Sequence, residues 1–331
     1  MIHYEKKDKH TDENTFFMSL SALRIVFMGT PEFAVASLDA LVKAGYNIVG
    51  VITAPDKPGG RGMQLQQSAV KQYAVEHNLP VLQPEKLKNP EFLSTLKSLQ
   101  ADLQIVVAFR MLPEVVWNMP PMGSVNLHGS LLPQYRGAAP INWAVINGEK
   151  ETGVTTFKLK HEIDTGDILL QEKFEIGENE TAGEVHDKMK EIGAGLLVKT
   201  VAGLAAGTLE EKPQLNTIGT DELKHAPKIF TETCLIDWQK SMTEIHNLVR
   251  GLSPYPAAFS FLEEKKLKIY EVEKVIKKPF DQPGDFETDH KTFLQFACID
   301  GYISIKTLQL EGKKKMEITD FLRGYRFKSD H

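Results

Sequence analysis

The feature that most constrains the fold of this chain is a short apolar run that ends at a glycine and leads into a segment of helical periodicity. The run is LRIVFMG, Leu23 to Gly29, and PEFAVASLDALVKAG follows it with apolar residues at helical spacing and an exit at Gly45. The same order returns in YNIVGVIT, SAVKQYAVEHN and ADLQIVVAF. This alternation predicts an α/β fold with an open, mostly parallel twisted sheet.

The periodicity changes in the last third of the chain. A long helix-like segment ends at Gly207, and short strand-like runs such as AFSFL, FLQFACI and YISIKTLQL lie beyond the aperiodic stretch that follows. Such runs predict a second, smaller domain, either a β-barrel or a sandwich. We therefore expect a disordered leader at 1–22, a first domain at 23–207, a linker at 208–225 and a β-rich domain at 226–331.

Composition excludes several classes of protein. Of the 331 residues, 42% are hydrophobic and 25% are charged, as in ordinary globular proteins. The net charge of −5 argues against a generally basic surface, but the chain carries 18 Lys and Arg against 18 Asp and Glu from Thr220 onward and 21 against 26 before it. The cysteines, Cys234 and Cys298, form no C-x-x-C pair, which fits a reducing cytoplasm. No apolar run reaches the roughly 20 residues that span a bilayer, so we expect no membrane association.

Common cofactor motifs are missing from the sequence. The MGTPEFA turn after the first run lacks the G-x-G-x-x-G of dinucleotide-binding proteins, and it is better explained as a tight turn that starts a helix. No P-loop and no G-x-S-x-G elbow occur. His, Cys, Asp and Glu show no metal-ligand spacing, so we predict no metal.

The stretch SVNLHGSLLPQYRGAAP contains the residues best suited to chemistry. Asn126 and His128 lie two positions apart at a predicted strand end, which points both side chains to one face. An amide can donate to a developing oxyanion while an imidazole moves a proton, as a reaction at a carbonyl carbon requires. The alternative is an Asn and a His that only satisfy backbone groups, and composition alone favours it.

A second candidate lies in the turn HEIDTGDI. Asp164 would orient His128 and favour its protonated form if the two side chains approach each other. Aspartate is also common in turns for purely local reasons. Sequence spacing alone leaves both interpretations open.

Several of these motifs occur together in one known family. MGTPEFA, the KPGGRG loop, NLHGSLLP, DTGDIL, the IDW at 236–238 and GKKKM closely resemble methionyl-tRNA formyltransferases, from about Leu23 to the C-terminal region. The resemblance implies formyl transfer from 10-formyltetrahydrofolate to the α-amino group of methionyl-initiator tRNA. It also implies a Rossmann-like catalytic domain, an OB-like β-barrel that contacts tRNA, and Asn126, His128 and Asp164 as the catalytic set.

The resemblance also implies where the folate lies. It places the folate along Ser130, Leu131, Leu132 and Pro133, and against Val107, Phe109 and Arg110. Here the sequence departs from the family pattern, because AFRMLP is shorter than the usual A-Y-G-L-I-L-P. Arg110 instead resembles the arginine at this place in glycinamide ribonucleotide formyltransferases.

Basic residues mark the expected contacts with tRNA. The family resemblance assigns Lys57 and Arg61 to a loop that meets the acceptor end, and their charges suit phosphate pairing. Lys313 and Lys314, like the cluster at 265–268, could follow tRNA phosphates, although such runs are usually only solvated faces.

The alternatives differ in the acceptor. An amino-sugar formyltransferase would use the same three catalytic residues on a nucleotide-linked amine. A catalytically inactive RNA-binding module would require one of the three to be replaced, and all are present. We expect a cytoplasmic enzyme with no obligate protein partner.

Overall fold

The computed structural model describes residues 22–59, 64–214, 222–279 and 282–327. The chain forms two compact units, each built from separate stretches of sequence. The first unit lies within 1–133, 153–172 and 188–221, and the second within 134–152, 173–187 and 222–331.

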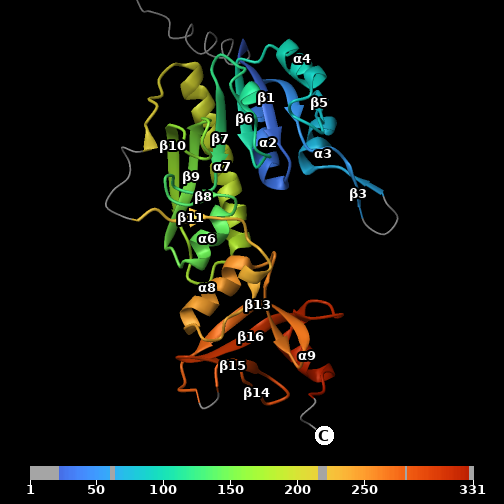
Figure 1. Cartoon of the computed structure of the whole chain (residues 1–331), viewed down its shortest axis with the longest axis vertical. Helices are drawn as coiled ribbons and strands as arrows, with labels where there is room; N and C mark the ends of the chain where they lie inside the picture. The colour runs from blue at the N-terminus through green and yellow to red at the C-terminus, as the bar shows by residue number, and fades with distance from the viewer. Residues whose placement is uncertain (1–21, 60–63, 215–221, 280–281, 328–331) are drawn as a thin grey trace, which may run out of the picture. The chain divides into compact units, whose positions relative to one another are not determined.

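The main sheet has seven strands in the order β10-β9-β7-β6-β1-β2-β5. Its members are β1 (Arg24–Gly29), β2 (Asn47–Ile52), β5 (Val81–Leu82), β6 (Leu103–Val107), β7 (Ser124–His128), β9 (Glu151–Lys158) and β10 (Ile168–Glu175). The five strands from β7 to β5 are parallel, and β9 runs antiparallel to β7 (Figure 1). This arrangement confirms the predicted open, mostly parallel α/β sheet.

Helices of the first unit bury one apolar face. They are α2 (Glu32–Lys43), α3 (Ala69–Glu76), α4 (Pro90–Ser98) and α5 (Glu114–Trp117), and α7 (Ala182–Ala205) belongs to this unit from Lys188 onward. Ser68 and Asn89 cap α3 and α4 by accepting hydrogen bonds from backbone amides of the first turn. Leu38 and Leu41 of α2 are fully buried, and such burial stabilises by about 1.5–3 kcal/mol per side chain.

A short hairpin extends from this unit. Its strands, β3 (Lys57–Gly59) and β4 (Gln64–Gln66), pair antiparallel and project away from the sheet (Figure 1). The segment predicted as a loop at 57–63 is therefore a two-stranded arm over its described part. Residues 60–63, which include Arg61, lie outside the described residues.

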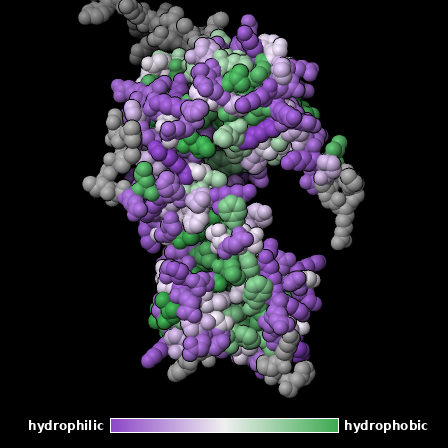
Figure 2. Space-filling model, in the orientation of Figure 1, coloured by the Kyte–Doolittle hydropathy of each residue, from purple (hydrophilic) through white to green (hydrophobic). Residues whose placement is uncertain are grey.

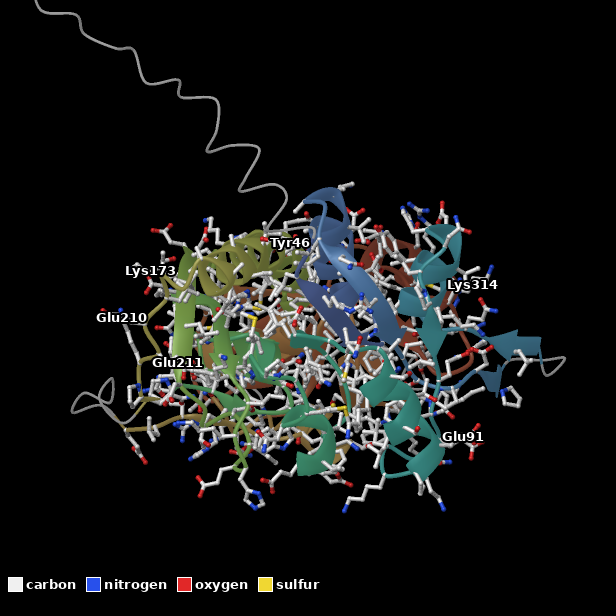
Figure 3. All side chains as sticks on the ribbon, turned by 90° about the horizontal axis from the view of Figure 1, so that it is seen from above. Tyr46, Glu91, Lys173, Glu210, Glu211 and Lys314 are labelled. Atoms are coloured by element: carbon white, nitrogen blue, oxygen red, sulfur yellow. The ribbon has the colours of Figure 1, made fainter. Side chains whose placement is uncertain are left out.

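Charged side chains surround the first unit. Hydrophilic residues predominate on the face of it seen in Figure 2. Glu91 on α4, and Glu210 and Glu211 beyond α7, lie at its outer margin (Figure 3). Part of the acidic excess of the N-terminal two-thirds is thus at this margin. Each helix in the described part of the chain is too short or too polar to span a bilayer.

The second unit contains a curled antiparallel half-barrel. Its sheet has the order β12-β13-β16-β15-β14, with β17 paired to β16. The strands are β12 (Ala258–Leu262), β13 (Lys265–Val275), β14 (Phe286–Thr288), β15 (Leu294–Cys298), β16 (Gly301–Leu310) and β17 (Met316–Glu317). With α8 (Met242–Leu252) and α9 (Ile318–Gly324) they enclose a core that includes Leu267, Phe296 and Ile305. The predicted β-barrel domain is confirmed in this half-barrel form.

The second unit also takes in residues from the middle of the chain. The short pair β8 (Arg136–Gly137) and β11 (His225–Ala226) is parallel, and α6 (Pro140–Ile146) packs on α8. The Asn142 amide donates to the carbonyl of Gly251 at 2.8 Å. These contacts make the unit discontinuous in sequence. The domain boundaries at 207 and 225 stay a prediction.

Candidate active site

Parallel strands bring the predicted site residues to one edge of the main sheet. β1, β2, β5, β6 and β7 all end there, so the segments that follow Gly29, Val107 and His128 share this edge. Ligands of open α/β sheets bind outside the carboxyl ends of the strands. The active site is therefore expected at this edge.

Asn126 and His128 lie on β7 as the sequence predicts. They pair with Phe157 and Thr155 on β9, and their separation by two positions places both side chains on one face of the sheet. His128 is buried, and its ring is nearly perpendicular to that of Phe157, at an interplanar angle of 82°. Asn126 is half-buried, and among the described residues its side-chain amide has no hydrogen-bond partner within the protein.

The structure brings Asp164 to His128. The Asp164 Oδ2 atom is 3.9 Å from the His128 Nδ1 atom, and the two side chains are 11% and 7% exposed. This distance is too long for a hydrogen bond but close enough for a strong charge interaction with a protonated ring. Asp164 has a φ of 55°, in the left-handed region, which aspartate tolerates better than most residues.

The turn that carries Asp164 is held by a residue that sequence reasoning missed. The buried Gln214 amide donates to the carbonyls of Asp164 and Gly166 at 2.9 and 2.8 Å. Gly166 itself is required, because a Cβ there would lie 1.6 Å from the carbonyl oxygen of Lys158. Gln214 falls in the predicted linker, where the sequence shows no signal for such a role.

The segment Ser130–Pro133 is fixed by side chains of neighbouring strands. The Thr155 hydroxyl donates to the Ser130 carbonyl at 2.7 Å and accepts from the Leu132 amide at 3.1 Å. Gln171 donates to the Leu132 carbonyl at 2.9 Å. Ser130, Leu132 and Pro133 are buried and Leu131 is half-buried. The sequence gives no signal that Thr155 anchors this segment.

The second segment predicted to meet folate follows β6. Val107 is fully buried, Phe109 is half-buried and Arg110 is exposed. The Arg110 guanidinium donates to the carbonyl of Glu85 at 2.7 Å and to that of Pro84. Arg110 therefore lies in the expected segment, and its side chain binds backbone carbonyls of the residues that follow β5.

The basic residues predicted to meet tRNA occupy two places. Lys57 is exposed at the start of β3, while its predicted companion Arg61 is outside the described residues. Lys313 and Lys314 are exposed in the turn that follows β16. The Glu311 amide donates to the Lys266 carbonyl at 2.9 Å, so the lysine clusters at 265–268 and 313–315 lie at the same end of the half-barrel.

Metal ligation finds no support in the side-chain arrangement. Within the described ranges, no group of three or more His, Cys, Asp or Glu side chains could hold a metal ion. The free thiols of Cys234 and Cys298 are both buried in the second unit, and burial raises the pKa of each. Neither thiol is suited to act as a nucleophile at neutral pH.

Two family models match this chain. The model described as "Formyl transferase" matches residues 23–201, and "Formyl transferase, C-terminal domain" matches residues 228–326.

Curated relatives match nearly the whole chain. A methionyl-tRNA formyltransferase of Bacteroides fragilis is 54% identical over 93% of this chain and 97% of the relative. One of Phocaeicola vulgatus is 58% identical over 93% of this chain and 98% of the relative.

Solved structures share the fold at low identity. WlaRD, a sugar 3N-formyl transferase, is 22% identical with a TM-score of 0.64, over 88% of this chain and 99% of that chain. An N-formyltransferase of Helicobacter canadensis, in complex with folinic acid and dTDP-3-aminofucose, is 22% identical with a TM-score of 0.63, over 89% and 100%. HypX of Aquifex aeolicus is 17% identical with a TM-score of 0.62. The match covers 92% of this chain but about half of HypX.

Proposed function

The chain belongs to the methionyl-tRNA formyltransferase family, and we propose that it transfers the formyl group of 10-formyltetrahydrofolate to the α-amino group of methionyl-initiator tRNA. The observation that carries the proposal is the Asn126 amide, unpaired among the described side chains, on the same strand face as the buried His128 with Asp164 beside it. This is the arrangement that a reaction through a tetrahedral oxyanion needs.

The roles of the three residues follow from their chemistry. The amine nitrogen bonds to the formyl carbon, and the carbonyl oxygen becomes an oxyanion that the Asn126 amide and protonated His128 stabilise. The bond from that carbon to the folate N10 then breaks, and the proton lost by the amine goes to N10 through His128. Asp164, whose carboxylate lies 3.9 Å from the His128 ring, would orient that ring by its charge.

The folate position follows from the two segments that flank Asn126. Val107 on β6 pairs with Leu127 on β7, and the segment Ser130–Pro133 begins two residues after His128. The buried Val107 and Leu132 would support the apolar wall of the pterin site from beneath, while Thr155 keeps the backbone of the second segment in place. We assign Phe109 to the same wall, and Arg110 to its support through the carbonyls of Pro84 and Glu85.

We assign tRNA as the acceptor because of the sequence identity to relatives and because of the basic residues of this chain. The relatives at 54–58% identity are methionyl-tRNA formyltransferases, whereas the sugar formyltransferases match at 22% and support the fold alone. Lys57 at the start of β3, together with Arg61, which the family resemblance assigns to the same tRNA contact, would meet the acceptor end. Lys313, Lys314 and the neighbouring cluster at 265–268 would follow phosphates. An enzyme that uses charged initiator tRNA works in the cytoplasm, and no obligate protein partner is needed for this reaction.

The experiment that tests the proposal is a single-turnover assay with the purified full chain. Protein, 10-formyltetrahydrofolate and methionyl-initiator tRNA are mixed, and formylmethionyl-tRNA and tetrahydrofolate are both quantified. We expect the two products in equal amounts, because one formyl group leaves the folate for each amine acylated. Tetrahydrofolate without formylated tRNA would contradict the proposal.

A further inference from the structure

The two ends of the β3–β4 hairpin are joined to each other by side chains. The hydroxyls of Thr53 and Ser68, which lie before and after the hairpin, are 2.7 Å apart. Asp56 is directly before β3, and its Oδ2 atom accepts from the Lys71 ammonium of α3 at 2.5 Å. The root of the arm is therefore closed by two contacts whose partners are each 15 residues apart in sequence.

A third element holds the same carboxylate. The Gln83 amide, directly after β5, donates to the Asp56 Oδ1 atom at 2.7 Å and to the Ala54 carbonyl at 2.8 Å. Asp56 thus accepts a hydrogen bond on each oxygen. The side chains of Asp56 and Lys71 are only 19% and 16% exposed. The hydrogen bond from Lys71, followed by that from Gln83, holds the pKa of Asp56 below its ordinary value.

This cluster sits on the edge of the sheet that carries the candidate active site. The Thr53 amide donates to the Leu82 carbonyl, which ties the end of β2 to the end of β5. The Val70 amide donates to the Thr30 carbonyl at 3.5 Å, which ties the start of α3 to the turn after β1. The hairpin thus starts from a fixed base at the carboxyl edge. When the residues at both ends of a hairpin are held in place, the direction in which the hairpin projects is also restricted.

We infer that Asp56, Lys71 and Gln83 act as positioning residues that fix the direction of the β3–β4 hairpin and so present it to the acceptor end of the tRNA. This role rests on the proposed function. A well-solvated ion pair contributes little, but this one is largely shielded from water and is completed by an amide that also binds backbone. None of the three residues needs to contact substrate.

The variants separate the contribution of the Asp56–Lys71 ion pair from that of the Asp56–Gln83 hydrogen bond. Asp56→Asn removes the charge that Lys71 binds and keeps an oxygen that can accept from Gln83. Lys71→Met removes the cationic partner of the same ion pair, whereas Lys71→Arg retains a charged donor. The matched control is Glu172→Gln, which removes an ion pair of the same unit, 3.1 Å from Lys199, on β10.

Enzyme kinetics, folate binding and hydrogen exchange on the full chain test the inference. We expect Asp56→Asn and Lys71→Met to raise KM for methionyl-initiator tRNA by about tenfold. The kcat value and the Kd of the probe 5-formyltetrahydrofolate should change less than about twofold. Lys71→Arg and Glu172→Gln should resemble the parent protein. Without substrate, hydrogen exchange at Gln64, Leu65 and Gln66 should rise in the two disrupting variants relative to that of β1.

The outcomes distinguish this inference from the proposed function. Unchanged exchange in β4 would overturn the positioning role whatever the activity of the parent protein. Faster exchange with an equal loss of tRNA use and folate binding would also overturn it, because the cluster would then support the whole site. A parent protein that formylates no aminoacyl-tRNA would refute the proposed function itself, and the role in presenting the hairpin would fail with it.

Discussion

At the scale of single residues, the side chain of Asn126 matters most for the proposed chemistry. Its amide is unpaired in the described part of the chain, unlike the neighbouring backbone groups that Thr155 satisfies. A donor kept free in this way is ready for an oxygen that gains charge in the transition state.

Replacing this donor gives the first prediction. Asn126→Ala should lower kcat for formyl transfer by about 10²–10³-fold, because one oxyanion donor is lost. The Kd of 5-formyltetrahydrofolate should change far less, since the donor acts mainly in the transition state. The control is Asn118→Ala, at the exposed end of α5. A loss that appears wholly in folate binding would assign Asn126 to ground-state recognition.

The buried His246 on α8 should make the free energy of unfolding depend on pH. Burial first, and then the charges of Lys274 and Arg250, lower the pKa of His246 from its ordinary value of 6.5. Below pH 6.5 the unfolded chain therefore binds more protons at this position than the folded chain. Stability from this group is complete above pH 6.5 and falls as the pH drops through the folded pKa.

The second prediction tests that dependence by denaturant unfolding. His246→Gln should flatten the decline in unfolding free energy of the second unit between pH 6.5 and 5. His77→Gln, at the exposed end of α3, is the control for losing a histidine. An unchanged slope in His246→Gln would show that other groups govern this range.

At the scale of elements, the turn with Asp164 depends on close backbone packing. Gly166 leaves no space for a Cβ next to Lys158, and Gln214 holds the carbonyls of Asp164 and Gly166. The turn therefore sets the approach of Asp164 to His128 more strictly than the aspartate side chain could alone.

The third prediction compares two glycines of the first unit. Gly166→Ala should displace the turn and lower kcat by at least about tenfold, because a misplaced catalytic group costs transition-state stabilisation. Gly195→Ala is the matched control: a Cβ there meets nothing within 4 Å, and alanine in the interior of α7 should stabilise by up to about 1 kcal/mol. Full activity in Gly166→Ala would contradict the role given to the turn.

At the scale of the whole molecule, the second unit is completed by the middle of the chain. Arg250 is buried and donates to the carbonyls of Gly177 and Glu180, at 3.4 and 3.0 Å. α6 approaches α8 so closely that a Cβ at Gly251 would lie 2.9 Å from the backbone nitrogen of Ile146. These contacts link α8 to chain segments before the predicted linker.

The fourth prediction concerns a fragment that begins at Thr208. Without residues 134–152 and 173–187, Arg250 loses the carbonyls of Gly177 and Glu180, and α8 loses the apolar contact with α6. Amides of α8 should exchange at least about tenfold faster in the fragment than in the full chain, while those of β15 and β16 change less. Equal protection of α8 in both would show that the C-terminal strands are sufficient to stabilise it.

The sequence predicts what depends on local periodicity. The parallel strands carry apolar runs, and the helices carry a 3.6-residue period, with capping side chains at α3, α4 and α8, so the sheet and its edge follow from the chain itself. The spacing of Asn126 and His128 indicates their common face for the same reason. The approach of Asp164 to His128 joins elements 36 residues apart, and only the family resemblance favoured it.

Other features depend on contacts that no local pattern encodes. Gln214 looks like any polar residue of a linker, and Thr155 like any residue of a buried strand. The packing of α6 on α8 and the pair formed by Asp56 and Lys71 likewise exist only after the chain has folded. Such features concern the supports of the site, whereas the residues proposed to react lie in recognisable motifs.

A competition between amines determines which acceptor the protein uses. Methionyl-initiator tRNA, elongator methionyl-tRNA, glycinamide ribonucleotide and a nucleotide-linked amino sugar are offered to the protein with 10-formyltetrahydrofolate, and kcat/KM is measured for each. We expect kcat/KM for initiator tRNA to exceed that for every other acceptor by at least about 10²-fold, a difference of about 2.7 kcal/mol in transition-state binding. A higher kcat/KM on the amino sugar would contradict it.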